Sequence, residues 1–317
     1  MADELSRWAA RRSPELIARA EAEAVALLRD ALVRAALGGE PEPVRRPVRS
    51  EEAGELVWAY CVLRASDARP EVPGVESASL LRVEAGGLAA LVSRVPRAEF
   101  GEEPLRRNLN DIDWLERVAR AHEQVLERAL ERATIVPLRL CTLYESEQGV
   151  RGMLERERKA LTDALDALGG RQEWGVKLLV DRDRLMAEAA ARSGESAIDA
   201  DSTGDGGAYM LRRRHERRVR ELADALAGEL AEEVHARLED RALAAITRPP
   251  QNRELSGHTG EMLLNAAYLV ETERIAELRE LVAELEAAGA PLGAHIELTG
   301  PWPPYNFVPG DAAATLA

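Results

Sequence analysis

The sequence contains few cysteines, few aromatic residues and no long apolar run. Its two cysteines, Cys61 and Cys141, each lie in a short apolar segment, so we expect buried free thiols rather than a disulfide framework or a zinc cluster. The longest unbroken apolar runs are short, such as Val57–Leu63, whereas a membrane helix needs about 18 such residues. The N-terminus is charged and lacks an apolar h-region, which predicts a cytoplasmic protein without a signal peptide or a membrane-spanning helix.

Short motifs of common enzyme families are also missing. No GxGxxG, GxxxxGK[ST], HExxH, GxSxG or CxxC motif occurs in the chain. The histidines are scattered, and no two of them lie three or four residues apart. Acidic residues mostly alternate with arginine at helical spacing, which is typical of a solvent-exposed helix face. We therefore expect no catalytic residue, no metal site and no cofactor.

The balance of charge is acidic. Asp and Glu number 56 and Lys and Arg 42, which gives a formal net charge of −14. This charge repels polyanions, so we expect no binding to nucleic acid or to an anionic membrane. The basic run Arg212–Arg214 is a local exception at the start of a predicted long helix. It is either a solvated helix face or a patch for an acidic partner.

The first part of the chain predicts a helix and a linker. Ser13 and Pro14 are favourable N-cap and first-turn residues, and apolar residues then recur at helical spacing as far as Leu32. Gly38 and Gly39 end this helix at residue 37, and a segment rich in proline and charge follows. We assign residues 1–53 to a helical extension and linker, whose apolar stripe either packs on the same chain or binds a partner.

Residues 54–170 are predicted to form a mixed α/β domain. Gly86–Gly87 separate two apolar runs, which indicates a hairpin. The run at 56–64 is almost wholly apolar and therefore predicts a central strand. The expected elements are strands at 56–64, 79–84 and 88–95, a helix at 112–132, a strand at 134–144 and a helix at 146–169.

Residues 171–310 are predicted to form a second domain, and residues 311–317 a tail. Apolar residues alternate from Trp174 to Val180 and from Leu292 to Leu298, as in half-buried strands. The expected elements are strands at 174–181, 241–248, 261–270 and 292–299, and helices from Arg182, at 208–238 and at 273–288. This βαββαβ order is that of a ferredoxin-like sandwich, with 241–248 as its weakest strand. The predicted fold class is thus α+β, with two domains and an N-terminal helical extension.

The segment GPWPPYNFVPG at residues 300–310 is unusual in composition. It contains four prolines and three of the twelve aromatic residues of the chain. Proline restricts the backbone, and a stiff backbone lowers the ordering cost of presenting aromatic side chains to a partner. The candidate partner-binding residues are therefore Trp302, Tyr305, Asn306 and Phe307. In the alternative interpretation, Trp302 and Phe307 seal the core while Tyr305 and Asn306 face outward.

Asn265 interrupts the apolar strand LLNAAYLV. A buried amide without a hydrogen bond costs roughly 1–3 kcal/mol. We therefore predict that Asn265 has a structural role, such as a tie between this strand and the Pro-rich segment.

The chain contains, in this order, the segments NLNDIDWLERVARAHEQVLE (108–127), TIVPLRLCTLY (134–144), WGVKLLVD (174–181), GEMLLNAAYLVE (260–271) and ELTGPWPPYNFVPG (297–310). Together these segments resemble the gas vesicle GvpL/GvpF family, and with VWAYCVL they cover about residues 54–308. The resemblance implies an N-terminal α+β domain, a C-terminal ferredoxin-like domain, and a gas vesicle accessory protein that contacts the hydrophobic major shell protein and other accessory proteins. It brings no catalytic residue or cofactor. PLRLCTLY is closer to the L branch than to the F branch, and the region 1–50 departs from the family pattern.

Two other functions compete with a role in binding and assembly. An enzyme built on a ferredoxin-like domain would need a cleft in which carboxylates or histidines with perturbed pKa values converge. An RNA-binding protein would need aromatic and arginine side chains on an open sheet face. The predicted strands are largely aliphatic and the chain is acidic, which disfavours RNA binding.

Overall fold

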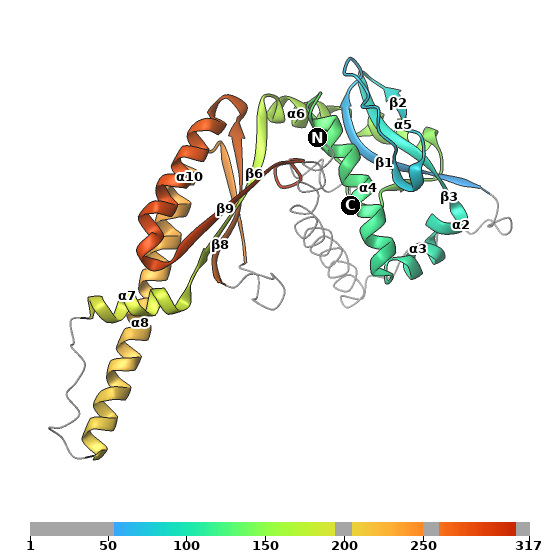
Figure 1. Ribbon diagram of the computed structural model, residues 1–317. Helices are drawn as coiled ribbons and strands as arrows, with labels where there is room; N and C mark the ends of the chain where they lie inside the picture. Colours follow the sequence, from blue (N-terminus) through green and yellow to red (C-terminus); the bar gives the residue numbers. More distant parts are fainter. Residues whose placement is uncertain (1–53, 194–204, 250–259, 309–317) are drawn as a thin grey trace, which may run out of the picture. The chain divides into compact units, whose positions relative to one another are not determined.

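The computed structural model describes residues 54–193, 205–249 and 260–308 (Figure 1). The predicted helix at 1–37 and the tail at 311–317 lie outside the described residues. The described chain forms two compact units that divide between Gly169 and Gly170.

The first unit is built on an antiparallel sheet with strand order β2-β3-β1-β4, in which β5 also pairs with β1. β1 is central and almost completely buried, as its apolar sequence predicts. The hairpin between β2 and β3 is confirmed, because Ala85 pairs with Leu88 while Gly86 and Gly87 adopt positive φ angles of 58° and 84°. The strands are β1 (Glu55–Arg64), β2 (Leu81–Ala85), β3 (Leu88–Pro96), β4 (Val136–Pro137) and β5 (Leu143–Tyr144).

Helices complete the first unit. They are the 3-10 turn η1 (Val75–Ser77), α2 (Arg97–Phe100), α3 (Glu102–Asn108), α4 (Ile112–Leu130), α5 (Glu147–Arg156) and α6 (Arg158–Leu168). α4 begins after Asp111, whose carboxylate accepts the backbone N–H groups of Asp113 and Trp114 at 3.1 and 3.2 Å. Such an N-cap satisfies donors that have no partner within the helix.

Three local predictions for this unit were wrong. The expected strand at 134–144 is two short strands, because Cys141 turns the chain with a φ of 65°. The expected helix at 146–169 breaks at Glu157, whose ψ of 8° is not helical. Cys61 is a buried free thiol, as expected, but Cys141 is only partly buried.

The second unit contains an antiparallel sheet with strand order β7-β8-β6-β9. The weak strand predicted at 241–248 is present as β7 at the edge of this sheet. The last strand begins later than expected, because η3 and Gly293, with a φ of 71°, precede it. The elements are β6 (Arg171–Val180), α7 (Arg182–Arg192), α8 (Asp205–Glu239), β7 (Ala244–Arg248), β8 (Glu261–Glu271), η2 (Thr272–Arg274), α10 (Ile275–Gly289), η3 (Ala290–Leu292) and β9 (Ala294–Trp302).

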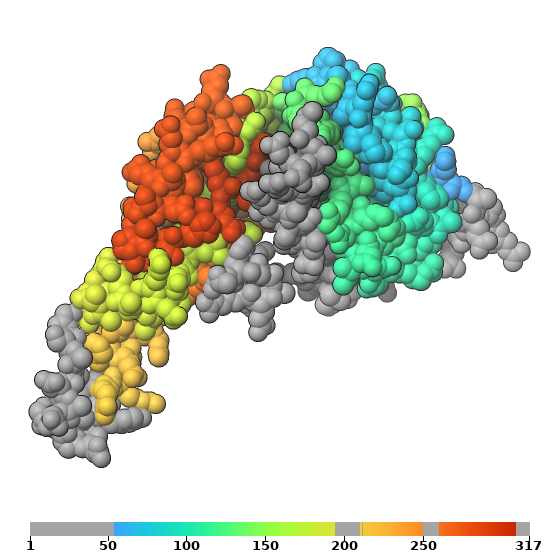
Figure 2. Space-filling model, viewed as in Figure 1, coloured from blue at the N-terminus to red at the C-terminus, as the bar shows by residue number. Residues whose placement is uncertain are grey.

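Helices α8 and α10 cover one face of this sheet (Figure 1). Alternate residues of β6, such as Val176 and Leu178, pack with Tyr268 of β8 and with apolar residues of both helices in one buried cluster. This alternation is what the sequence of β6 predicts. The N-terminal half of α8 extends past the sheet in Figure 1 and reaches the surface in Figure 2.

Candidate partner-binding site

The Pro-rich segment continues directly from β9. Pairing between β6 and β9 extends as far as Trp302, which lies opposite Glu173. At Gly300 the backbone has a φ of 136°, and a Cβ atom there would lie 3.0 Å from the carbonyl oxygen of Glu173 and 3.1 Å from the ring of Trp174. Only glycine fits this close approach of two strands without strain. The peptide bond from Gly300 to Pro301 is cis.

Trp302 is buried, with 6% of its surface exposed. Its indole Nε1 donates to Thr299 Oγ1 at 3.0 Å. The predicted strand ended at residue 299, whereas β9 continues to Trp302. Trp302 is therefore part of the sheet, paired with Glu173 of β6. The structure thus favours the core-sealing alternative for Trp302.

The rest of the segment is held by a buried carboxylate. Glu173 is 1% exposed, and its Oε1 accepts from Asn306 Nδ2 at 2.5 Å while its Oε2 accepts from the Asn306 backbone N–H at 3.1 Å. Arg248 of β7 donates to Asn306 Oδ1. A buried carboxylate is tolerated when hydrogen bonds replace its lost hydration. Asn306 therefore links the segment to β6 and to β7.

Two turns shape the segment around this contact. The Tyr305 N–H donates to the Pro303 carbonyl at 2.8 Å, and the Phe307 N–H donates to the Pro304 carbonyl at 3.2 Å. Tyr305, Asn306 and Phe307 are each partly exposed. We name residues Tyr305–Phe307 the aromatic turn. Its two aromatic residues, Tyr305 and Phe307, flank Asn306, which is hydrogen-bonded to both Glu173 and Arg248.

Sequence reasoning singled out the aromatic turn but missed Glu173. Glu173 is one of many acidic residues in the chain, and no periodic pattern separates it from the solvent-exposed ones. Asn265 lies half-buried in β8, between Lys177 of β6 and Arg248 of β7. The contacts described above that hold the segment come from Glu173 and Arg248, so the tie through Asn265 stays a prediction.

The first unit contains a buried cluster around His122. The indole Nε1 of Trp58 donates to His122 Nδ1 at 3.0 Å, and His122 Nε2 lies 3.2 Å from the Leu138 carbonyl oxygen. His122 is therefore neutral, with its proton on Nε2. Burial lowers the pKa of His122 from 6.5 to about 4. Tyr60 stacks on the imidazole with 5.3 Å between ring centroids, and its hydroxyl bonds to Ser93 Oγ at 2.6 Å. These contacts are those of a core histidine.

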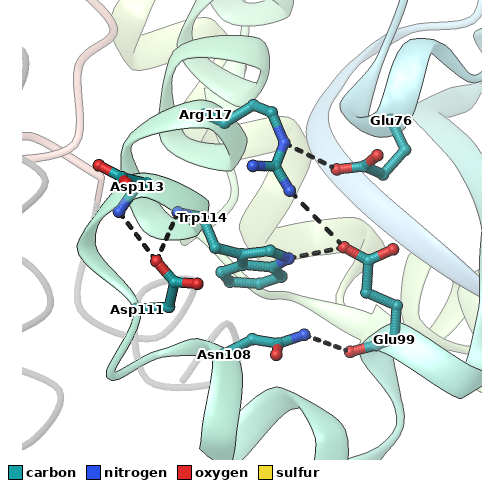
Figure 3. A network of polar contacts seen from close by, with 7 residues as sticks. All are labelled: Glu76, Glu99, Asn108, Asp111, Asp113, Trp114 and Arg117. Atoms are coloured by element: carbon teal, nitrogen blue, oxygen red, sulfur yellow. Dashed lines mark hydrogen bonds and ion pairs between the residues drawn. The ribbon is translucent and has the colours of Figure 1, made fainter.

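A polar network joins η1, α2 and α4 (Figure 3). Glu99 Oε1 accepts from Trp114 Nε1 at 2.6 Å and lies 3.9 Å from Arg117 Nη2. Arg117 Nε lies 3.3 Å from Glu76 Oε1, and Asn108 Nδ2 donates to the Glu99 carbonyl oxygen at 3.1 Å. The network fixes the corner where the segment NLNDIDW turns from α3 into α4.

The other histidines do not gather into a site within the described chain. His215 is half-buried on α8, His235 Nδ1 lies 2.8 Å from the Tyr268 hydroxyl oxygen, and His295 Nδ1 lies 2.6 Å from Glu286 Oε1. His258 lies outside the described residues. Across residues 54–193, 205–249 and 260–308, no group of three or more His, Cys, Asp and Glu side chains is placed to hold a metal ion. None of the described helices combines the length and the apolar character needed to cross a membrane.

Comparisons with known proteins agree on one family. The family model described as gas vesicle synthesis protein GvpL/GvpF matches residues 56–309. Gas vesicle protein L of Streptomyces sp. (strain CB03234) is 38% identical over 80% of this chain and 92% of its own length. Gas vesicle protein F of the same organism is 27% identical over 70% of this chain and 85% of its own. The higher identity to the L protein agrees with the branch that PLRLCTLY favours.

A solved structure shows the same fold. The crystal structure of GvpF from Anabaena sp. PCC7120 aligns with a TM-score of 0.56 and 20% identity, covering 81% of this chain and 97% of that protein. The family match spans most of the chain, so this protein belongs to the GvpL/GvpF family of gas vesicle synthesis proteins.

Proposed function

We propose that this protein helps to assemble gas vesicles by binding the hydrophobic major shell protein and other accessory proteins. It acts in the cytoplasm and at the gas vesicle, through contacts alone, without a catalytic step, a cofactor, nucleic acid or a membrane. The observation that carries the proposal is the aromatic turn, which the buried Glu173 holds in place through Asn306.

Rigidity is what makes the aromatic turn suitable for binding. An interface loses affinity for every side chain and loop that must be ordered on association. Here the backbone is already fixed by prolines, by two turns and by the Glu173–Asn306 hydrogen bonds. Tyr305 and Phe307 can then contribute apolar contact area at a low entropic cost.

The charge of the chain fits the same role. A shell subunit must keep a very apolar face covered until it enters the vesicle wall, because exposed apolar patches aggregate. A binding protein with a net charge of −14 would keep such a complex in solution. The apolar contact would come from the aromatic turn and the solubility from the acidic surface elsewhere.

We also assign the second unit to the ferredoxin-like class. Its strands and helices follow the order βαββαβ once α7 and α8 are counted as one connection, and its sheet order β7-β8-β6-β9 places the first and third strands in the centre. The proposed domains remain residues 54–170 and 171–310, and the division between Gly169 and Gly170 supports this boundary.

Pull-down of the shell protein tests the binding proposal. The tagged chain is co-expressed with the major shell protein, and retention of the shell protein is measured for the wild type and for the variant Tyr305→Ala/Phe307→Ala. Met210→Ala removes an exposed apolar side chain elsewhere, since Met210 is 55% exposed, and serves as the control. We expect the double variant to retain at least about tenfold less shell protein, since truncated anchors cost about 1–2 kcal/mol each.

Two results would contradict the proposal at different levels. A wild-type chain that retains no shell protein would reject shell binding. Retention that is equal in the wild type and in the double variant would reject the aromatic turn as the contact. A deletion strain of a vesicle-forming host, scored by buoyancy and electron microscopy, tests the wider role, and vesicles of normal number and shape would reject it.

A further inference from the structure

Strand β7 forms an open edge of the second sheet. Within the described residues it pairs with β8 alone, from Ala244 to Arg248, and this pairing has no bulge. Four of its five residues are exposed, and Ala245 is half-buried. In an antiparallel strand, the backbone N–H and C=O groups of alternate residues point away from the paired neighbour. These groups are therefore directed outward along β7, where a further strand can pair with them.

The composition of this edge lacks the usual protection against strand pairing. Natural edge strands are commonly protected by lysines, prolines, inward-pointing charges or bulges. The segment Ala242–Thr247 has no charged residue and no proline, although 31% of the whole chain is charged. The first charge and the first proline, Arg248 and Pro249, come only at its end. Two large apolar side chains are exposed here, Leu243 at 46% and Ile246 at 38%. Such an edge is suited to accept another strand.

Ile246 points to the face of the sheet opposite to α8 and α10. Ala245 pairs with Tyr268, which belongs to the buried cluster beneath these helices, and Ala245 packs against the same cluster. Successive side chains of a strand point to opposite faces of its sheet. Ile246 and Arg248 therefore share the other face.

The aromatic turn is held on this same face. On β6, Glu173 precedes Trp174, which belongs to the buried cluster, so Glu173 points away from the helices. Asn306 is hydrogen-bonded to both Glu173 and Arg248. These contacts fix the aromatic turn beside β7, on the side to which Ile246 points. One partner can therefore contact the open edge and the aromatic turn together.

We propose that a β-strand of the major shell protein pairs with the open edge of β7. This inference rests on the proposed shell binding and specifies how the shell protein is held. The four-stranded sheet gains one strand, whose backbone hydrogen bonds to the outward groups of β7. Apolar side chains of the added strand pack on Ile246 and reach the aromatic turn on the same face.

An apolar partner fits this edge better than a second copy of the chain. Two copies each carry a net charge of −14 and therefore repel each other. The shell protein must keep a very apolar face covered until it enters the vesicle wall. An edge without charged residues can cover such a face without burying an unpaired ion.

Hydrogen–deuterium exchange on the full-length chain tests the strand pairing directly. Exchange of backbone amides in peptides covering residues 242–248 is measured by mass spectrometry, for the free wild type and for its isolated complex with the shell protein. The outward amides of β7 gain a hydrogen bond when a strand is added. We therefore expect them to exchange at least about tenfold more slowly in the complex. Peptides covering β2, an edge strand of the first sheet, are the control and should exchange at an unchanged rate.

The variant Ile246→Lys provides an independent test, because lysine on an edge strand opposes the addition of another strand. We expect retention of the shell protein in the pull-down to fall at least about tenfold. Met210→Lys makes the same kind of change at an exposed apolar residue of α8 and should retain shell protein like the wild type. Urea unfolding checks that both variants fold.

The outcomes separate this inference from the proposed function. A wild type that retains no shell protein would reject both. Shell protein that is retained while the β7 amides exchange as in the free chain would overturn strand pairing and leave shell binding intact. Equal retention by the wild type and by Ile246→Lys would overturn it as well. Exchange at β7 that slows in the free chain as its concentration rises would assign the edge to a second copy instead.

Discussion

His122 shows how a single buried residue makes stability depend on pH. In the folded chain the pKa of His122 is about 4, and its ordinary value is 6.5. Between these values the unfolded chain binds a proton that the folded chain excludes. The contribution of His122 to stability is therefore complete above pH 6.5 and is lost as pH falls toward 4. A difference of this size corresponds to at most about 3 kcal/mol.

The variant His122→Gln isolates this effect, because glutamine does not titrate. We expect wild type and variant to differ in free energy of unfolding at pH 7, and this difference to shrink by about 2 to 3 kcal/mol at pH 4.5. Urea unfolding at both pH values measures it, and titrating carboxylates cancel in the comparison. A difference that does not change with pH would contradict the hydrogen bond from Trp58 to an unprotonated Nδ1.

Glu173 is the second residue with a distinct expected effect. Glu173→Gln replaces one carboxylate oxygen with an amino group, which would face an N–H donor of Asn306. We expect the free energy of unfolding to fall by about 1–3 kcal/mol, because one buried polar group is left unpaired. Chemical unfolding measures the change, and the exposed Glu271→Gln on β8 is the matched control. An equal effect of both substitutions would argue against the Glu173–Asn306 contact.

At the scale of elements, apolar periodicity predicted most strands and helices but not where they break. The spacing of Met153, Leu154, Leu161 and Leu165 continues in phase across Glu157, so the pattern does not reveal that α5 ends there. The turn at Cys141 is equally hidden, because cysteine is not a typical residue for a positive φ angle. Long, strongly periodic elements such as α4 and β8 were predicted correctly, since burial of a whole face determines them.

The candidate site was predictable in part for a related reason. Four prolines and three aromatic residues in one short segment are visible in the sequence. Asn306 and Glu173, however, lie 133 residues apart, and only the pairing of β9 with β6 brings them together. The extension of β9 to Trp302 decides which aromatic side chain is buried, and that extension is a property of strand pairing rather than of local composition.

Two glycines of the second unit should respond in opposite directions to alanine. Gly300→Ala introduces a Cβ atom 3.0 Å from the Glu173 carbonyl oxygen at a φ of 136°, so we expect a loss of about 1–3 kcal/mol in free energy of unfolding. Gly228→Ala meets no atom within 4 Å in the middle of α8, and we expect a gain of about 0.5–1 kcal/mol. Urea unfolding at low protein concentration compares them. Equal effects would show that the conformation at Gly300 is not constrained.

At the scale of the whole molecule, the proposed contact with the shell protein can be made by either of two physical forces. The aromatic turn would bind through apolar contact area, whereas a strongly acidic surface with a net charge of −14 could bind through opposed charges. Apolar contacts persist or strengthen as salt is added, because salt does not screen them. Pairs of exposed charges weaken, because the screening length falls from about 10 Å at 0.1 M to about 3 Å at 1 M ionic strength.

Salt should therefore show which force holds the shell protein. Between 0.1 M and 1 M sodium chloride we expect retention of the shell protein by the wild-type chain to change by less than about twofold, because salt does not screen apolar contacts. Pull-down at a series of salt concentrations measures this retention. Retention that falls by about tenfold or more over this range would place charge, rather than the aromatic turn, at the shell contact.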